Sequence, residues 1–222
     1  MNEEIRQELT EYLLSQGASD VGFFKYSEEK LPYGISVAVR LSEAIIWEID
    51  SEPTHTYFNH YRSVNSLIDS LLLKAGLFLQ KKGYKYITVA ASQSINKDGW
   101  NYCARFSHKI GARLSGMGFI GKNALFIHKD YGSLVRLGTV FTDCELAGSE
   151  NKIISSGCDG CNICAKVCPA AAINEKSFDE NNPGEYLIDP KACSDYMKQN
   201  FQKIGRGSVC GLCIRYCPFN RL

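Results

Sequence analysis

The most informative stretch of this 222-residue sequence reads Cys158-Asp-Gly-Cys161-Asn-Ile-Cys164-Ala-Lys-Val-Cys168-Pro169. Its four cysteines are spaced C-x2-C-x2-C-x3-C, and a proline follows the last one. A second run, Cys210-Gly-Leu-Cys213-Ile-Arg-Tyr-Cys217-Pro218, repeats the end of this pattern, and Cys193 stands alone upstream of it. The second run is therefore the same motif with its first cysteine displaced toward the N-terminus.

This spacing is that of bacterial two-cluster ferredoxins, in which the fourth cysteine of each run binds the other cluster. Three closely spaced thiolates can wrap one face of an iron–sulfur cube, while the fourth points away. Crossing the fourth ligands predicts two 4Fe–4S clusters with four cysteines each. The predicted ligands of the first cluster are Cys158, Cys161, Cys164 and Cys217. Those of the second are Cys168, Cys193, Cys210 and Cys213.

Zinc and disulfides are the alternative uses of so many cysteines. Zinc sites favour two separated C-x2-C pairs and seldom add a third cysteine and a C-P ending. Disulfide frameworks are typical of short secreted chains, and the N-terminus lacks the charged-then-apolar pattern of a secretion signal. The longest apolar runs, such as residues 71–73, are also far too short to cross a membrane. We therefore expect reduced thiolates, a cytoplasmic location and no membrane partner.

Composition places the chain among ordinary globular proteins. It is 45% hydrophobic and 22% charged, and its formal net charge of +1 lacks the basic excess of a dedicated nucleic-acid binder. Residues 1–150 are enough for a core of their own. Residues 151–222 are too few to bury sufficient apolar surface, so the clusters must hold that part together. We expect two domains divided near residue 150.

Apolar spacing predicts alternating helices and strands before the cysteines, hence an α+β sandwich. Helices are expected from Ile5 to a cap at Gly17, from Val64 to Gly83, and over residues 100–114. Residues 54–61, rich in histidine and aromatic side chains, are predicted as a solvated loop. Strands are expected over residues 18–26, 35–41, 85–91, 124–128 and 133–141, the last two paired as a hairpin.

Gly116-Met-Gly118-Phe-Ile-Gly121 formally satisfies the dinucleotide-binding pattern G-x-G-x-x-G. That mechanism requires the glycines to leave a strand and open a helix, so that the helix N-terminus meets the pyrophosphate. Here the predicted order is reversed, with a helix before the glycines and a strand after them. Two interpretations stay open: a helix-to-strand turn without a ligand, or a close-approach loop for a flat or anionic cofactor, with Lys122 and Asn123 beside it.

These glycines also belong to a family resemblance. The chain is similar to the cobalamin-binding half of epoxyqueuosine reductases, where an A-G-L-G-W-x-G-K-N/H segment precedes two strands with a G-S between them. The similar segments here are residues 115–123, 124–128, 131–133 and 138–141. Residues 187–193 and 210–221 resemble the second-cluster segment of the same family.

The resemblance implies a nitroreductase-like α/β sandwich, shared with reductive dehalogenases, followed by a bacterial ferredoxin-like two-cluster domain. It implies that electrons run from an external low-potential donor, of ferredoxin or flavodoxin type, through both clusters to a corrinoid (cobalamin) that reduces the substrate. By the same resemblance, the residues bordering the corrinoid would be Gly116, Gly118, Gly121, Lys122, Asn123, Gly132 and Ser133.

Two departures from the family affect the expected function. Residues 89–93 read Val-Ala-Ala-Ser-Gln, where the family has the aspartate thought to donate a proton. The family's C-terminal helical-repeat domain, which helps hold tRNA, has no counterpart, so tRNA is not the expected substrate. One expectation is an iron–sulfur oxidoreductase of unidentified substrate. The alternative is a ferredoxin-like electron carrier or corrinoid activator that serves a partner protein. Whether the N-terminal pocket holds a corrinoid, a flavin or nothing stays open.

Overall fold

The computed structural model describes residues 2–27, 29–95, 102–146, 152–181, 187–205 and 209–220. The chain forms two compact units, each assembled from three separate stretches. The first unit comprises Met1–Arg40, Val64–Gly118 and Val135–Ile154. The second comprises Leu41–Ser63, Phe119–Leu134 and Ser155–Leu222. The expected division near residue 150 stays a prediction about domains.

A four-stranded antiparallel sheet organises the first unit. Its strands, in spatial order, are β1 (Asp20–Lys25), β2 (Tyr33–Arg40), β6 (Val135–Thr142) and β3 (Tyr86–Val89). The register pairs Gly22 with Ser36, and Thr139 with both Ser36 and Val89. Because directly opposite residues share a face, these four positions line one side of the sheet. The mixed helix-and-sheet architecture predicted from the sequence is confirmed.

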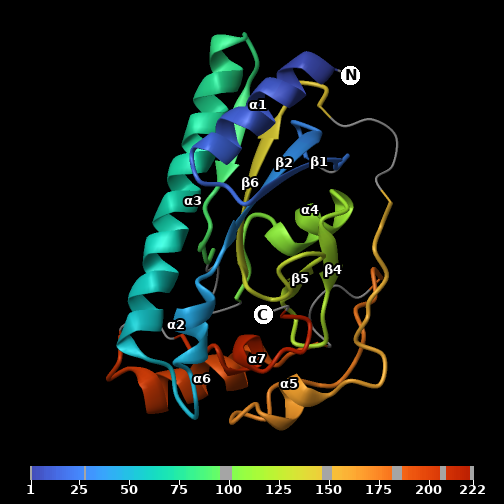
Figure 1. Cartoon of the computed structure of the whole chain (residues 1–222). Helices are drawn as coiled ribbons and strands as arrows, with labels where there is room; N and C mark the ends of the chain where they lie inside the picture. Colours follow the sequence, from blue (N-terminus) through green and yellow to red (C-terminus); the bar gives the residue numbers. More distant parts are fainter. Residues whose placement is uncertain are drawn as a thin grey trace. The chain divides into compact units, whose positions relative to one another are not determined.

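Helices cover both faces of this sheet. On one face lie α1 (Glu3–Ser15) and α3 (His55–Lys81), and on the other lies α4 (His108–Leu114) (Figure 1). A side chain at Gly138 of β6 would collide with Ile68 and Leu72 of α3, at 2.4 and 2.9 Å. On the other face, a side chain at Gly22 would meet Met117, just after α4. The two glycines thus allow a helix to approach each face closely.

The long helix corrects one expectation. Residues 55–61, predicted as a solvated loop, form the first turns of α3, and Tyr57 is 2% exposed. Thr54 Oγ1 accepts a hydrogen bond from the Tyr57 amide at 3.0 Å, as a side chain at a helix N-cap does. The sequence did not predict these turns as helix because the apolar stripe of α3 was taken to begin at Val64. In the structure, buried Tyr57 and Phe58 extend that stripe toward the N-terminus.

The predicted hairpin between residues 124–128 and 133–141 is wrong. Strand β5 (Phe126–His128) pairs with β4 (Gly118–Ile120), whereas β6 pairs with β2 and β3. A single bridge between His128 and Gly132 is what remains of the expected connection. The physical reason is burial: seven of the eight residues of β6 are buried, so β6 is paired along both edges.

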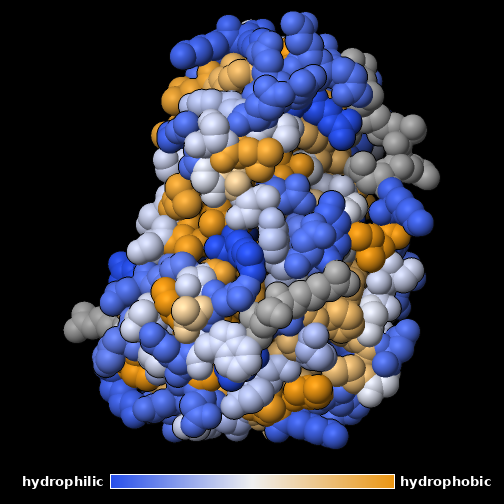
Figure 2. All heavy atoms as spheres, in the orientation of Figure 1, coloured by the Kyte–Doolittle hydropathy of each residue, from blue (hydrophilic) through white to orange (hydrophobic). Residues whose placement is uncertain are grey.

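Besides the first turns of α3, the described residues of the second unit form four helices. They are α2 (Glu43–Trp47), α5 (Ile163–Lys166), α6 (Pro190–Phe201) and α7 (Leu212–Arg215). Asp189 caps α6 by accepting a hydrogen bond from the Ala192 amide at 2.9 Å, and Pro190 occupies the first turn. In the part of the chain that the structure describes, no helix is long and apolar enough to span a membrane. Figure 2 shows polar and apolar atoms interspersed on the viewed face.

Candidate metal centre

Two short helices carry the cysteine runs and contact one another. Helix α5 contains Cys164 and α7 contains Cys213. Gly211 at the N-cap of α7 has a φ of +81°, and a side chain there would meet Ile49 and Tyr57 at 2.7 and 2.8 Å. A residue without a side chain is therefore needed for α7 to begin where it does.

The first predicted ligand set lines one cavity. Cys217, from the second run, joins Cys158, Cys161 and Cys164 of the first. The remaining lining residues are Lys122, Asn123, Ile127, Pro218 and Phe219. Burial raises the pKa of Cys217, whereas a hydrogen bond from the Phe219 amide lowers it. The geometry brings both runs to one place, and cluster binding by these four residues stays a proposal.

The cysteines of the second predicted set influence one another. Burial raises the pKa of Cys193 to about 11, and the neighbouring sulfurs of Cys168 and Cys210 contribute to the rise. Burial also raises the pKa of Cys213, with contributions from Cys210, Cys193 and Cys168. Thiolates gathered in a buried place need positive charge to offset their desolvation. The cationic iron of a cluster would supply it, so this set of donors suits such a group.

A single metal ion would need a tighter arrangement. Among the described residues, no three His, Cys, Asp or Glu side chains converge in a way that could hold one metal ion. A cube instead takes one cysteine at each of its four iron atoms, which spreads its ligands over a wider site.

The glycine-rich segment begins where α4 ends. Gly116 has a φ of +71°, β4 lies inside the glycine-rich segment, and β5 follows it, so the predicted helix before the glycines and strand after them are confirmed. The Gly121 amide donates to the Leu125 carbonyl at 2.9 Å, which closes a tight turn. A side chain at Gly121 would lie 2.9 Å from Asn123 Oδ1 and 3.0 Å from Ile127. Packing within the turn therefore accounts for this glycine.

Lys122 and Asn123 contact the cysteine-bearing segments. Lys122 is 8% exposed, and its Nζ donates to Asn162 Oδ1 at 2.9 Å. Asn162 lies between Cys161 and Cys164 in sequence. Asn123 is also buried, and its Nδ2 donates to the Cys213 carbonyl at 3.3 Å. This pair thus reaches segments that carry ligands of both predicted clusters.

Gly132 and Ser133 contact the segment that follows Cys217. A side chain at Gly132 would lie 2.3 Å from the Phe219 carbonyl oxygen. Ser133 is buried, and both its amide and its hydroxyl donate to Asn220 Oδ1 at 2.9 Å. Asn220 Nδ2 in turn donates to the Ile214 carbonyl at 2.7 Å. These contacts fasten the end of the second cysteine run. The predicted role of all seven residues in bordering a corrinoid stays a prediction.

Sequence reasoning missed Asn162 and Asn220 as parts of this site. Asn162 is a spacer inside a cysteine motif, Asn220 follows the last cysteine by three positions, and their partners are 40 and 87 positions away. The run Cys-Pro-Phe-Asn contained Asn220, but nothing in the spacing identified Ser133 as its partner.

A separate polar group lies under α4 in the first unit. His108 is held between the Ala90 carbonyl at 2.9 Å and Thr139 Oγ1 at 2.8 Å, and burial lowers its pKa. Asp69 Oδ1 accepts from the Ala91 amide at 2.9 Å. On the same face of the sheet, the buried hydroxyl of Ser36 has no hydrogen-bond partner among the described residues.

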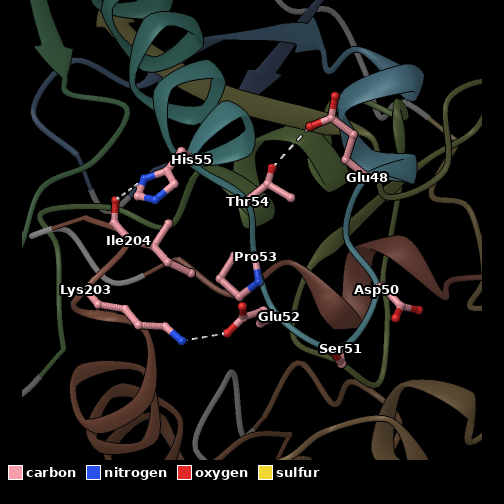
Figure 3. Close-up of a pocket in the computed structure, with 9 residues that line it drawn as sticks. All are labelled: Glu48, Asp50, Ser51, Glu52, Pro53, Thr54, His55, Lys203 and Ile204. Atoms are coloured by element: carbon pink, nitrogen blue, oxygen red, sulfur yellow. Dashed lines mark hydrogen bonds and ion pairs between the residues drawn. The ribbon is translucent and has the colours of Figure 1, made fainter.

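A second cavity, of about 520 Å³, lies within the second unit (Figure 3). Figure 3 shows Lys203 and Glu52 pointing toward one another. Lys203 Nζ lies 3.0 Å from Glu52 Oε2, and His55 Nδ1 lies 3.1 Å from the Ile204 carbonyl oxygen. These contacts join the start of α3 and the residues before it to the turn after α6. The residues lining this cavity are Glu48, Asp50, Ser51, Glu52, Pro53, Thr54, His55, Lys203 and Ile204. None of them is a cysteine, and most of the polar groups are engaged with one another.

Comparison with known proteins places these cysteines in a recognised class. Residues 157–220 match the family of 4Fe-4S double cluster binding domains. The prediction of two 4Fe–4S clusters is thereby confirmed.

The particular relatives are epoxyqueuosine reductases and reductive dehalogenases. The epoxyqueuosine reductase of Synechocystis sp. is 32% identical over 117 residues, covering 51% of this chain and 39% of that protein. That of Lactococcus garvieae is 27% identical over 121 residues, covering 50% and 31%. A tetrachloroethene reductive dehalogenase of Desulfitobacterium hafniense is 28% identical over 122 residues, covering 49% and 21%. The predicted resemblance is thus confirmed over half of the chain.

Solved structures show the same fold. A catabolic reductive dehalogenase superposes on all of this chain with a TM-score of 0.76 and 18% identity, and the match covers 32% of that protein. An epoxyqueuosine reductase in complex with a tRNA stem loop superposes on 99% of this chain with a TM-score of 0.64 and 17% identity, covering 66% of that chain. The chain spans about a third of the length of the curated relatives it matches.

Proposed function

We propose that this protein is an iron–sulfur oxidoreductase that passes electrons through two 4Fe–4S clusters to a corrinoid. The observation that carries the proposal is the cavity shared by Cys217 and the first three cysteines of the other run. Lys122 and Asn123 line the same cavity, and they belong to the segment that resembles the cobalamin-binding half of epoxyqueuosine reductases. Cluster ligands and the segment that resembles a cofactor-binding loop are thus built into one site.

The chain's own residues would perform separate tasks in electron transfer. Eight thiolates would hold the two clusters in the crossed arrangement, with Cys217 and Cys168 each serving the cluster of the other run. Asn123 connects the first cavity to the backbone of Cys213, because its side chain lines that cavity and donates to the Cys213 carbonyl. Ser133 and Asn220 hold the segment after Cys217 in place. An external low-potential donor of ferredoxin or flavodoxin type, in the cytoplasm, would supply the electrons.

The corrinoid part of the proposal rests on the relatives and on one structural observation. The structure of a reductive dehalogenase that superposes on all of this chain suggests a mechanism for B12-dependent dehalogenation by that protein. In the first unit, the buried hydroxyl of Ser36, on the face of the sheet under α4, has no hydrogen-bond partner among the described residues. When bound, a corrinoid supplies a strongly reducing cobalt centre. On this reading the first unit is nitroreductase-like and the cysteine-bearing part ferredoxin-like, with a small molecule or modified nucleoside as substrate.

A second candidate function is favoured by the segment after β3. It lacks the family's aspartate, and its backbone is occupied: His108 contacts the Ala90 carbonyl and Asp69 accepts from the Ala91 amide. A protein without a proton donor there would serve as an electron carrier or corrinoid activator for a partner protein. On this reading it would have no substrate of its own.

Metal content separates the two functions. The protein would be purified anaerobically, reconstituted with iron and sulfide, and incubated with cobalamin before gel filtration. The proposal expects about eight iron atoms and about one cobalt per chain. About eight iron atoms without cobalt would leave the electron-carrier function and overturn the corrinoid assignment. Fewer than about four iron atoms, or zinc in their place, would overturn the cluster assignment itself. The Cys158→Ser variant serves as the control for site-specific loss of iron.

A further inference from the structure

We propose that Lys122 raises the reduction potential of the first cluster, and only of that cluster. The inference rests on the cluster ligation proposed above, and it assigns to a residue of the glycine-rich segment a role in electron transfer. In this role Lys122 acts as a fixed positive charge beside the cluster. It does not bind iron or substrate.

The position of Lys122 is the first part of the argument. Its side chain lines the cavity formed by Cys158, Cys161, Cys164 and Cys217. Lysine is almost never buried without a compensating group, yet this one is 8% exposed. Its Nζ hydrogen-bonds to the neutral amide of Asn162, which does not cancel its charge. Four thiolates in the same cavity supply the negative charge that a buried ammonium requires.

Asn162 fixes where this charge lies. Its Nδ2 donates to Glu175 Oε2 at 2.6 Å, so its Oδ1 is the atom that faces Lys122 at 2.9 Å. Because Asn162 stands between two cysteines of the first run, the lysine is tied to the ligand segment itself. The flexible lysine side chain thereby gains one defined place beside the first cluster.

The charge acts on the redox equilibrium through simple electrostatics. A 4Fe–4S cube with four thiolate ligands is negatively charged, and reduction adds one more negative charge. A buried cation attracts the reduced form more strongly than the oxidised form, and low local polarity strengthens that attraction. Cluster potentials respond to net charge in this way. The step is a one-electron transfer in which the donor is oxidised and the cluster reduced, with no bond made or broken.

The second cluster has a different charged neighbour. Asp189, at the start of α6, accepts a hydrogen bond at 2.9 Å from the amide of Ala192, the residue before Cys193, so a carboxylate lies beside that ligand set. The two clusters therefore meet charges of opposite sign. Electrons would be held more strongly at the first cluster, where Lys122 lies.

The test is a redox titration of the reconstituted protein followed by electron paramagnetic resonance. The Lys122→Gln variant removes the charge and keeps a long polar side chain, whereas Lys122→Arg keeps the charge. At a fixed potential, Lys122→Gln should lower the ratio of reduced to oxidised first cluster at least about tenfold, which corresponds to about 59 mV for one electron. Lys122→Arg should stay within about threefold of the wild type, a shift of less than half of that.

Two controls belong to the same experiment. The second cluster is an internal control, since its ratio should be unchanged in Lys122→Gln, and the signal of the first is identified by its loss in Cys158→Ser. Lys203→Gln removes an equal charge from the same unit, at an exposed lysine paired with Glu52. This variant should shift neither cluster, because exposed charges are screened by salt.

Each outcome decides a different point. If both signals persist in Lys122→Gln at unchanged ratios, the role of Lys122 is overturned while the clusters stand. If both shift equally, the claimed selectivity is overturned. If wild-type protein lacks two cluster signals, the proposed function fails instead. Should Lys122→Gln lose its first cluster, Asn162→Asp replaces it: a carboxylate beside Lys122 offsets its charge and should lower the first ratio in the same direction, and an unchanged ratio there would overturn the proposal.

Discussion

Replacing Gly132 by alanine tests how tightly the second cysteine run is fastened. Gly132 has a φ of +59°, in the left-handed region that costs a residue with a side chain about 1–2 kcal/mol. The added Cβ would also lie 2.3 Å from the Phe219 carbonyl oxygen and 2.7 Å from the Asn220 amide nitrogen. These are backbone atoms that no rotamer change can move away, and overpacking of this kind costs a further ~1–3 kcal/mol.

Gly160→Ala is the matched control. Gly160 lies in the same unit, also next to cluster cysteines, and has a φ of +71°, but its added Cβ meets no described atom within 4 Å. It should therefore suffer the conformational cost alone, about 1–2 kcal/mol. The difference between the two variants isolates the collision with the segment after Cys217.

The assay is thermal unfolding of reconstituted protein under anaerobic conditions, with iron measured on the same samples. At about 2–4 °C per kcal/mol for a chain of this size, the extra cost of Gly132→Ala should lower its midpoint about 2–12 °C below that of Gly160→Ala. Its iron content should fall, because displacing Phe219 moves Cys217. Equal midpoints together with full iron would refute the reasoning that Gly132 is required by contact with this segment.

Three further predictions follow from single contacts. Cys217→Ser should remove the same cluster signal as Cys158→Ser, because both line one cavity; loss of different signals in resonance spectra would contradict the crossed arrangement. Asp189→Ala should cost about 0.5–2 kcal/mol in denaturant unfolding by removing the cap of α6, whereas Asp189→Asn should retain most of it. Burial holds the pKa of His108 below 6.5. As the pH drops below about 6.5, His108 therefore becomes protonated in the unfolded chain while it stays neutral in the folded chain, and the free energy of unfolding should fall. In His108→Gln the change in unfolding midpoint between pH 7.5 and 5.5 should be smaller than in the wild type, and an equal change would argue against this assignment.

Several features of the fold were predictable because they depend on neighbours in sequence. The stripe of apolar residues from Val64 to Leu79 predicted most of α3, since helical periodicity is a local property. Helix-to-strand order around the glycines was predictable for the same reason. Boundaries were less certain: the first turns of α3 rest on the burial of Tyr57 and on the Thr54 cap, and their aromatic and histidine-rich sequence resembled a loop.

The pairing of strands could not be predicted in this way. Strand β6 follows β5 closely in the chain but pairs with β2, about one hundred residues back, and with β3, about fifty residues back. Because β6 is almost completely buried, its backbone needs a partner strand on both edges. Sequence proximity alone favoured a hairpin between β5 and β6.

What the sequence by itself determined was the cofactor chemistry. Cysteine spacing within a dozen residues restricts where the thiolates can point, so the covalent chain alone indicated two 4Fe–4S clusters. Only the tertiary structure decided which side chains surround those cysteines. It places Lys122 beside the first set through its hydrogen bond to Asn162, and it places Ser133 in contact with Asn220. These contacts join residues 40 and 87 positions apart. They form because a buried polar group is cut off from water and needs a hydrogen-bond partner within the folded chain.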